Sequence, residues 1–183
     1  MMHVTHVTIG LGAVRAAETL WRRAGGSVAV RIDYRFAAAG ALLPDAIDQP
    51  LKHILFPGEF ADAHVYGHTL LLPSLLILTG LLLARHGDLR LLVLGIACLS
   101  HTLVDPVTTY PETLFWPLFG TDFPEATQSY REYYQPMIEA VLVATYVVAL
   151  ASSERWRERE MRFLRYGSFP GEDSDPERGQ VQA

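Results

Sequence analysis

The sequence predicts an all-α protein, a multi-helix bundle that is integral to a membrane and has three to five helices. Half of its 183 residues are hydrophobic and only 19% are charged, against about 25% in typical soluble domains. The apolar residues gather in blocks, and residues 66–84 contain no Asp, Glu, Lys or Arg. That block is close to the roughly 20 residues that a helix needs to cross a bilayer.

The first third of the chain predicts two helices and a turn. In residues 4–20 apolar side chains recur on successive helical turns, and two glycines at 25–26 end that helix. Residues 27–43 are weaker, because their first part alternates like a strand while their second part favours a helix; we assign a helix. The segment 44–50, bounded by two prolines, predicts a turn that opens a short helix.

Three apolar blocks carry the membrane interpretation. Residues 66–84 are long enough for a span, 91–104 are short, and 136–153 are interrupted by Glu139. A buried helix of a soluble bundle is therefore the competing interpretation. We favour a membrane protein, because these blocks and the first helix leave little polar surface for a chain of this size.

The last part of the chain changes in character. The loop 106–135 is rich in Pro, Tyr, Phe and Trp, as at a membrane interface or in a surface lid. From Glu154 to residue 166 the charges predict a helical extension. Residues 167–183 turn to Gly, Pro, Asp, Glu and Ser and predict a disordered acidic tail. We therefore expect one helical membrane domain, 1–166, that carries the functional site.

Charge limits both the location and the partners. If the apolar blocks alternate in direction, the arginines near 22, 85 and 90 and those of the C-terminal helix fall on one side, as the positive-inside bias requires. The candidate ligands fall on the other side: His3, His6, His64, His68, His101 and Asp105. We expect a multi-pass protein of the cell membrane whose polar face is extracytoplasmic and which contacts membrane lipid. The net charge of −5 gives no reason to expect nucleic-acid binding.

Four short groups place imidazoles and carboxylates at helix-face spacing. They are His3/His6, Asp45/Asp48, His64/His68 and His101/Asp105. Imidazole and carboxylate ligands without thiolate suit Zn²⁺, Mn²⁺ or Fe²⁺. Cys98 is the only cysteine, so a thiolate cluster is excluded. More than four such ligands allow a site with two metal ions.

The pair His101 and Asp105 is the centre of this pattern. Residues four apart lie on one helix face, and Pro106 directly after Asp105 predicts that the helix stops at Val104 or Asp105. Both side chains then lie at a helix C-terminus, where free carbonyls favour a cation. The alternative interpretation is a structural His–Asp hydrogen bond between neighbouring helices.

Each of the other candidates also has a structural interpretation. His6 fits an ordered surface residue near a terminus, Asp45 a helix N-cap and Asp48 the end of a turn. His64 and His68 fit side chains that reach from an apolar helix toward the interface.

Glu139 is a further candidate, whereas two other histidines are not. Glu139 interrupts an apolar block, where an acidic residue is costly and often functional. His53 and His86 fit surface residues, and we assign them no role.

These motifs resemble the YdjM-like family, whose members are inner-membrane-associated and are classed, by inference, as metal-dependent hydrolases. The resemblance covers roughly residues 5–120 and runs through Thr5-His6, Leu-Pro-Asp45-Ala-Ile-Asp48, Gly67-His68 and Ser-His101-Thr-Leu-Val-Asp105, followed by Trp-Pro117. The acidic pair is spaced one residue wider here than in the family, and the family's His-Arg-x-x-Thr-His has become His-Val-Tyr-Gly-His.

A more distant likeness is to zinc phospholipase C and the single-strand nucleases of the same all-α fold. His6, Asp45, His68, His101 and Asp105 repeat the order of their ligands. No histidine follows His101, so the likeness implies at most one or two metal ions rather than three. It implies hydrolysis of a phosphoester, by analogy of fold alone.

The sequence thus predicts a metal-dependent hydrolase at the membrane that acts on a small-molecule or lipid ester, most plausibly a phosphoester, through a metal-activated water. The expected ligands are His6, Asp45, His68, His101 and Asp105, with His64 as a further candidate. Asp48 or Glu139 is expected as a partner to a ligand or as a base. The competing hypothesis is a membrane adaptor or ion-handling protein with a structural metal site or polar cavity.

Overall fold

The computed structural model describes residues 3–25, 31–60, 63–105, 110–123 and 151–169, with some residues between 137 and 148. It is all-helical over these residues, as the sequence predicts, and none of them forms a strand. The helices are α1 (His3–Arg23), α2 (Arg35–Pro50), α3 (Leu71–Ala84), α4 (Arg90–Val104), α5 (Pro111–Leu114) and α7 (Glu154–Tyr166), with a π-helical turn η1 (Leu51–Leu55) and a 3-10 turn η2 (Tyr66–His68).

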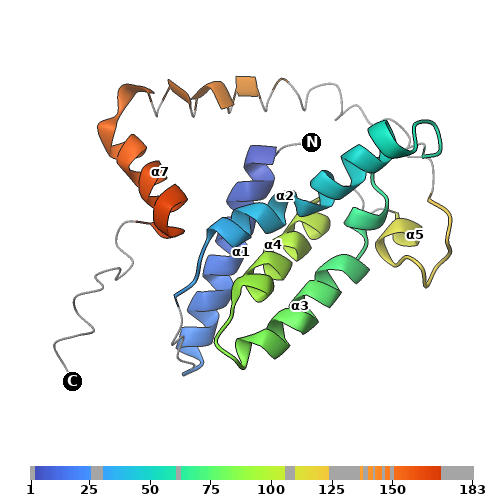
Figure 1. Cartoon of the computed structure of the whole chain (residues 1–183), viewed down its shortest axis with the longest axis horizontal. Helices are drawn as coiled ribbons and strands as arrows, with labels where there is room; N and C mark the ends of the chain where they lie inside the picture. The colour runs from blue at the N-terminus through green and yellow to red at the C-terminus, as the bar shows by residue number, and fades with distance from the viewer. Residues whose placement is uncertain are drawn as a thin grey trace.

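Helix α4 is the centre of the bundle and packs against α1, α2 and α3 (Figure 1). The core between these helices is made mainly of small and aliphatic side chains, with Val14, Ala41 and Ala97 fully or almost fully buried. Close approach depends on glycine: a Cβ atom added at Gly40 of α2 would lie 2.2 Å from the Leu94 carbonyl oxygen of α4. Small residues therefore bring α2 and α4 into backbone contact.

Helix α2 corrects the sequence prediction at both of its ends. The expected turn at residues 44–50 is wrong, because α2 continues through Pro44 to Pro50. Its buried residues, which include Ala37, Ala41, Pro44 and Asp48, recur every three or four positions. That continuous buried stripe outweighs the hydrogen bond that Pro44 cannot donate. The helix expected over residues 27–43 begins only at Arg35, because the described residues 31–34 form neither a helix nor the alternative strand.

The expected span 66–84 is also corrected. Its first residues form the 3-10 turn η2, and α3 has only 14 residues, which is about 21 Å at 1.5 Å per residue. Helix α4 has 15 residues and ends at Val104, as Pro106 predicts. Among the described residues, no helix combines the length and the apolar character needed to cross a bilayer.

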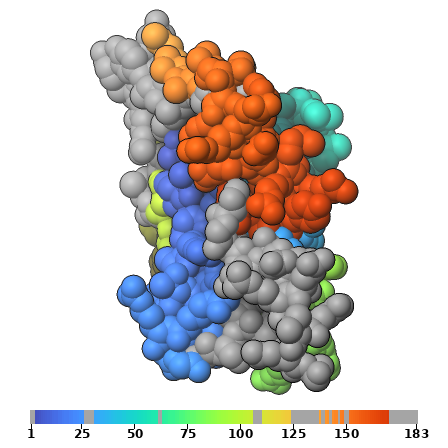
Figure 2. Space-filling model, turned by 90° about the vertical axis from the view of Figure 1, so that its left-hand side faces the viewer, coloured from blue at the N-terminus to red at the C-terminus, as the bar shows by residue number. Residues whose placement is uncertain are grey.

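The C-terminal segment is only partly described. The expected block 136–153 is described only in part, and Glu139 lies outside the described residues, as do residues 170–183 of the expected tail. The charged helix α7 forms as predicted and lies on the α1 side of the bundle (Figure 2). It is attached at its C-terminal end, where the Tyr34 N–H donates to the Gly167 carbonyl oxygen at 2.8 Å and Phe163 stacks on Phe169.

Candidate metal centre

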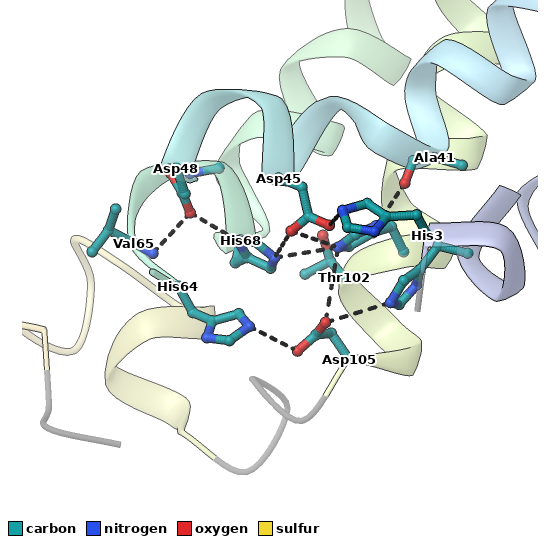
Figure 3. A network of polar contacts seen from close by, with 12 residues as sticks. His3, Ala41, Asp45, Asp48, His64, Val65, His68, Thr102 and Asp105 are labelled. Atoms are coloured by element: carbon teal, nitrogen blue, oxygen red, sulfur yellow. Dashed lines mark hydrogen bonds and ion pairs between the residues drawn. The ribbon is translucent and has the colours of Figure 1, made fainter. Parts of the chain in front are cut away.

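Six side chains from four segments converge at one end of the bundle, which we call the metal end (Figure 3). They form a cluster of four imidazoles and two carboxylates: His6 of α1, Asp45 of α2, His64 and His68 around η2, and His101 and Asp105 at the end of α4. We refer to these residues as the six-residue cluster. All except His64 are buried.

The end of α4 places two members of the cluster. His101 lies in its last turn, and Asp105 follows in an extended conformation, with φ −72° and ψ 148°. This break turns the Asp105 carboxylate back toward the helix end, and its Oδ2 lies 3.9 Å from His101 Nε2. The position combines two ligand atoms with the negative end of the helix dipole, which favours a cation.

Two imidazole nitrogens face each other at the middle of the cluster. His101 Nδ1 donates to the Ala41 carbonyl oxygen at 2.6 Å, and His68 Nδ1 donates to Asp48 Oδ2 at 2.7 Å. Each Nε2 atom therefore directs its remaining position into the cluster, and the two lie 3.2 Å apart. Lone pairs at this distance repel unless a proton or a metal ion lies between them. Two nitrogens on one tetrahedral zinc ion would be about 3.3 Å apart.

Asp45 adds a carboxylate whose oxygens receive no hydrogen bond from any described residue, although its side chain is only 5% exposed. Its Oδ1 lies 3.3 Å from His68 Nε2 and 3.8 Å from His101 Nε2. Buried carboxylate oxygens are normally satisfied, and leaving them without donors costs free energy. The donor atoms present therefore fit a cation that Asp45, His68 and His101 would share.

Asp105 joins the other two histidines to this centre. Its Oδ1 lies 3.3 Å from His64 Nε2, and its Oδ2 lies 3.6 Å from His6 Nε2. Three overlapping triplets result, in each of which one ligand atom per residue lies within 4.8 Å of the others. They are His6–His101–Asp105, Asp45–His68–His101 and His64–His68–Asp105.

The protonation states of three ligands, His6, His101 and Asp105, favour metal binding at neutral pH. Burial alone would lower the pKa of His68 as well, but the Asp45 and Asp48 carboxylates outweigh its burial and raise that pKa. Burial lowers the pKa of His101 to about 4, and it also lowers the pKa of His6. Burial alone would raise the pKa of Asp105, but its contact with His64 and the surrounding imidazoles outweigh this effect and lower that pKa to about 2. Neutral imidazoles and an ionised carboxylate are the forms that bind a metal.

Asp48 lies next to the cluster and is fully buried. Its oxygens accept the N–H groups of Val65 and Gly67, at 2.8 and 2.7 Å, and also His68 Nδ1. Gly67 permits this approach, because a Cβ atom there would lie 2.5 Å from the Pro44 carbonyl oxygen. Asp48 thus fixes the turn η2 and the orientation of His68. Of the two roles expected for it, this geometry suits the partner to a ligand.

Several expectations for single residues are changed by these positions. Asp45 is not a helix N-cap, because it lies inside α2, and His68 does not reach toward an interface, because it is fully buried. His3 lies nearer than the sequence suggested: its Nε2 is 3.7 Å from Asp45 Oδ2, and its side chain is 53% exposed. The Ala41 carbonyl was missed, because a backbone acceptor leaves no signal in the sequence. Glu139 lies outside the described residues.

An aromatic group adjoins the metal end. Tyr66 of η2 contacts Trp116 and Phe123 edge-to-face, and Phe60 contacts Tyr66 and Phe123 in the same manner. The backbone ties this group to the cluster, because the Leu70 N–H donates to the Leu114 carbonyl oxygen of α5 at 2.9 Å. This aromatic group therefore adjoins His64 and His68 through Tyr66, which lies between them in the sequence.

Comparison with known proteins gives one match. The family model described as YdjM inner membrane protein matches residues 1–167. No curated protein and no solved structure matches the chain, so the likeness to zinc phospholipase C is not shown.

Proposed function

Because the chain belongs to the YdjM family of inner membrane proteins, we propose that its six-residue cluster holds one or two divalent metal ions and hydrolyses an ester at the membrane. The observation that carries this proposal is the pair of Nε2 atoms of His68 and His101, 3.2 Å apart beside the Asp45 carboxylate. Both Nδ1 atoms donate to acceptors, so the two Nε2 lone pairs and the Asp45 oxygens are available to coordinate a cation.

The chemistry of the ligands allows either one ion or two. An imidazole Nε2 has one lone pair and binds one metal ion, whereas a carboxylate can bridge two through its two oxygens. The triplet Asp45–His68–His101 would therefore hold a single ion. Alternatively, His6 with His101 and His64 with His68 would hold one ion each, with Asp105 between them, because its Oδ2 faces the first pair and its Oδ1 faces His64. Zn²⁺, Mn²⁺ and Fe²⁺ suit this donor set.

A divalent ion bound here would act as a Lewis acid and lower the pKa of a coordinated water to about 7. The protein's own part is to fix the ligands. Asp48 and the Ala41 carbonyl hold the two central imidazoles in one tautomer and orientation, which such partners do in metal sites.

Exposure of the cluster favours the hydrolase over a closed structural site. The side chain of His64 is 20% exposed, and that of the neighbouring His3, which lies near Asp45, is 53% exposed, so the cluster adjoins the surface. A catalytic ion needs a position open to water and substrate, whereas a structural ion is enclosed by protein ligands. The neighbouring group of Phe60, Tyr66 and Trp116 supports a substrate with an apolar part, such as a lipid ester. A phosphoester remains the first class to test.

Contact with membrane lipid is supported by the outer face of α3. Six of its exposed side chains are leucines, Leu71, Leu75, Leu78, Leu81, Leu82 and Leu83, and the other two are Ser74 and Thr79. Monomeric soluble proteins rarely expose a contiguous apolar surface of this kind. The multi-pass topology with an extracytoplasmic metal face stays a prediction from the arginine distribution.

Metal content and turnover measured on the same samples test the proposal. The purified full chain would be loaded separately with Zn²⁺, Mn²⁺ and Fe²⁺, freed of excess metal, and assayed with a chromogenic phosphodiester and a carboxylic ester. His101→Ala is the test variant, and His53→Ala is the control, because His53 is exposed and belongs to none of the three triplets. We expect bound metal and turnover in wild type and control, and neither in His101→Ala. Metal bound without turnover of either ester would favour the structural-site hypothesis.

A further inference from the structure

A second polar site lies at the opposite end of the bundle, which we call the arginine end. A cavity of about 400 Å³ there is lined by the segment before α2, the connection from α3 to the first residue of α4, and the end of α7. Its polar side chains are those of Arg31, Asp33, His86, Asp88, Arg90 and Tyr166. The volume lies within the range of about 300–1,000 Å³ that is typical of small-molecule sites.

The carboxylates of this cavity are already engaged. Asp33 pairs with the Arg35 guanidinium, with Nη2 2.6 Å from Oδ2, and hydrogen bonding to Arg35 lowers the pKa of Asp33. Asp88 Oδ1 accepts the Arg90 N–H at 2.9 Å, at the first residue of α4. Within the described part of the chain, neither carboxylate forms an ion pair with Arg31, His86 or Arg90, the cationic residues that line the cavity.

The cations of the cavity are not engaged in this way. Arg31 contacts the Ser168 hydroxyl, and the Arg90 guanidinium lies over the Phe36 ring, 5.8 Å from its centroid. Within the described residues, Arg31, His86 and Arg90 form no ion pair. The N-terminus of α4 opens into the same space and adds the positive end of the helix dipole. The cavity therefore presents two guanidinium groups that form no ion pair within the described residues, beside the Asp33 and Asp88 carboxylates.

We propose that the cavity lined by Arg31, His86 and Arg90 binds a phosphate group. Guanidinium groups suit phosphate because they donate two parallel hydrogen bonds. The phosphate would belong to an anionic lipid headgroup or to a free small molecule. The headgroup is supported by α3, whose exposed leucines continue to Leu83, three residues before His86, so acyl chains could lie along α3 while the phosphate lies in the cavity.

The test measures binding by the full chain in a zwitterionic detergent. One arm titrates a short-chain phosphatidylglycerol, with the matching phosphatidylcholine as reference, and the other titrates inorganic phosphate. The test variant is Arg31→Gln with Arg90→Gln. The matched control is Arg85→Gln with Arg23→Gln, which removes the same charge from two exposed arginines outside the cavity.

We expect the cavity variant to weaken binding about tenfold or more, since two charge-assisted contacts are lost, and the control to leave it unchanged. Binding of the lipid alone identifies a headgroup, and binding of inorganic phosphate as well identifies a free phosphate site. Binding of neither, or equal loss in both variants, would overturn the proposal. If the cavity variant unfolds, Arg31→Lys with Arg90→Lys keeps the charge and should bind phosphate more weakly than wild type. Metal content should be unchanged in all of these variants, which separates this site from the metal end.

Discussion

The two ends of α4 use polar residues in opposite ways. At its C-terminal end, His101 and Asp105 are almost completely buried, together with His68 and Asp45. At its N-terminal end, Arg90 is exposed to solvent, and the five arginines of α7 are exposed as well. The same helix therefore connects a buried ligand cluster with a solvated basic surface.

Because the polar residues are buried at one end and exposed at the other, the two ends differ in how strongly they indicate a binding site. A buried polar group costs free energy unless a partner compensates for it, so a cluster of them needs an ion or a proton to be stable. An exposed arginine costs little, because water solvates it, and surface ion pairs contribute about 0–1 kcal/mol. Burial of the polar groups alone indicates a binding site at the metal end. At the arginine end exposed arginines indicate a site only where a cavity brings Arg31 and Arg90 together.

The largest expected effect is the loss of a central ligand. His101→Gln removes the Nε2 atom that two of the three triplets share, while the amide retains much of the volume and a donor for the Ala41 carbonyl. We expect metal affinity to fall about 100-fold or more, beyond what the loss of an outer partner usually costs. Competition titration with a chromogenic chelator measures this change. Unchanged affinity in His101→Gln would mean that the ion, if any, binds elsewhere.

The pH dependence of the metal-free protein tests the burial of His101 directly. Burial lowers its pKa to about 4 from the ordinary 6.5, so between these values the unfolded chain binds a proton that the folded protein does not. Stability is then full above pH 6.5 and falls as the pH drops toward 4, by at most about 3 kcal/mol. His68 acts in the opposite direction: burial alone would lower its pKa, but the neighbouring Asp45 and Asp48 carboxylates outweigh that and raise it.

Chemical unfolding of metal-free wild type and His101→Gln at pH 7 and pH 4.5 separates these contributions. The variant should lose less stability on acidification than wild type does, because its side chain at position 101 does not titrate. The control His53→Gln should follow wild type. An identical pH dependence in all three proteins would show that protonation of His101 does not cause the loss of stability at pH 4.5.

Sequence patterns predicted the helices wherever one local signal decided them. The end of α4 at Val104 follows from Pro106, and the charged helix α7 follows from its composition. Helix α2 was missed beyond Pro44, because proline usually ends a helix and only the packing of Ala37, Ala41 and Asp48 against the core keeps this one intact. The turn η2 was missed for a similar reason, since its shape depends on the carboxylate of Asp48 from another helix.

The site was easier to predict than the fold around it. Ligand chemistry restricts the candidates to His, Asp and Glu, and six of the residues expected as ligands do converge. What the sequence could not supply is the set of long-range contacts that orient them, such as the Ala41 carbonyl at His101 and the two backbone N–H groups at Asp48. The closeness of His3 to Asp45 also depends on how α1 packs on α2.

A smaller effect is expected from the residue that orients His68. Asp48→Asn keeps the shape of the side chain but replaces one acceptor oxygen by an amide donor, which would face Val65 N–H, Gly67 N–H or His68 Nδ1. We expect metal affinity to fall about 10–100-fold while the protein still folds. Affinity is measured as for His101→Gln, with the exposed Glu59→Gln as control. If Asp48→Asn lost stability but bound metal normally, Asp48 would serve the turn η2 and not the metal end.

The smallest effect is expected at the arginine end, where an exposed arginine pairs with a largely buried glutamate that keeps its contacts with Arg15 and Tyr34. Arg22 Nη2 lies 2.8 Å from Glu18 Oε1, one helical turn away on α1, and the arginine side chain is 57% exposed. Arg22→Gln should lower the free energy of unfolding by about 0.5 kcal/mol, and by less at high salt, because solvent and ions screen such a pair. Arg23→Gln removes the same charge one residue further along α1 and serves as control. A loss of several kcal/mol in Arg22→Gln alone would show that burial does not govern the contrast between the two ends, because an exposed group would then matter as much as the buried ligands.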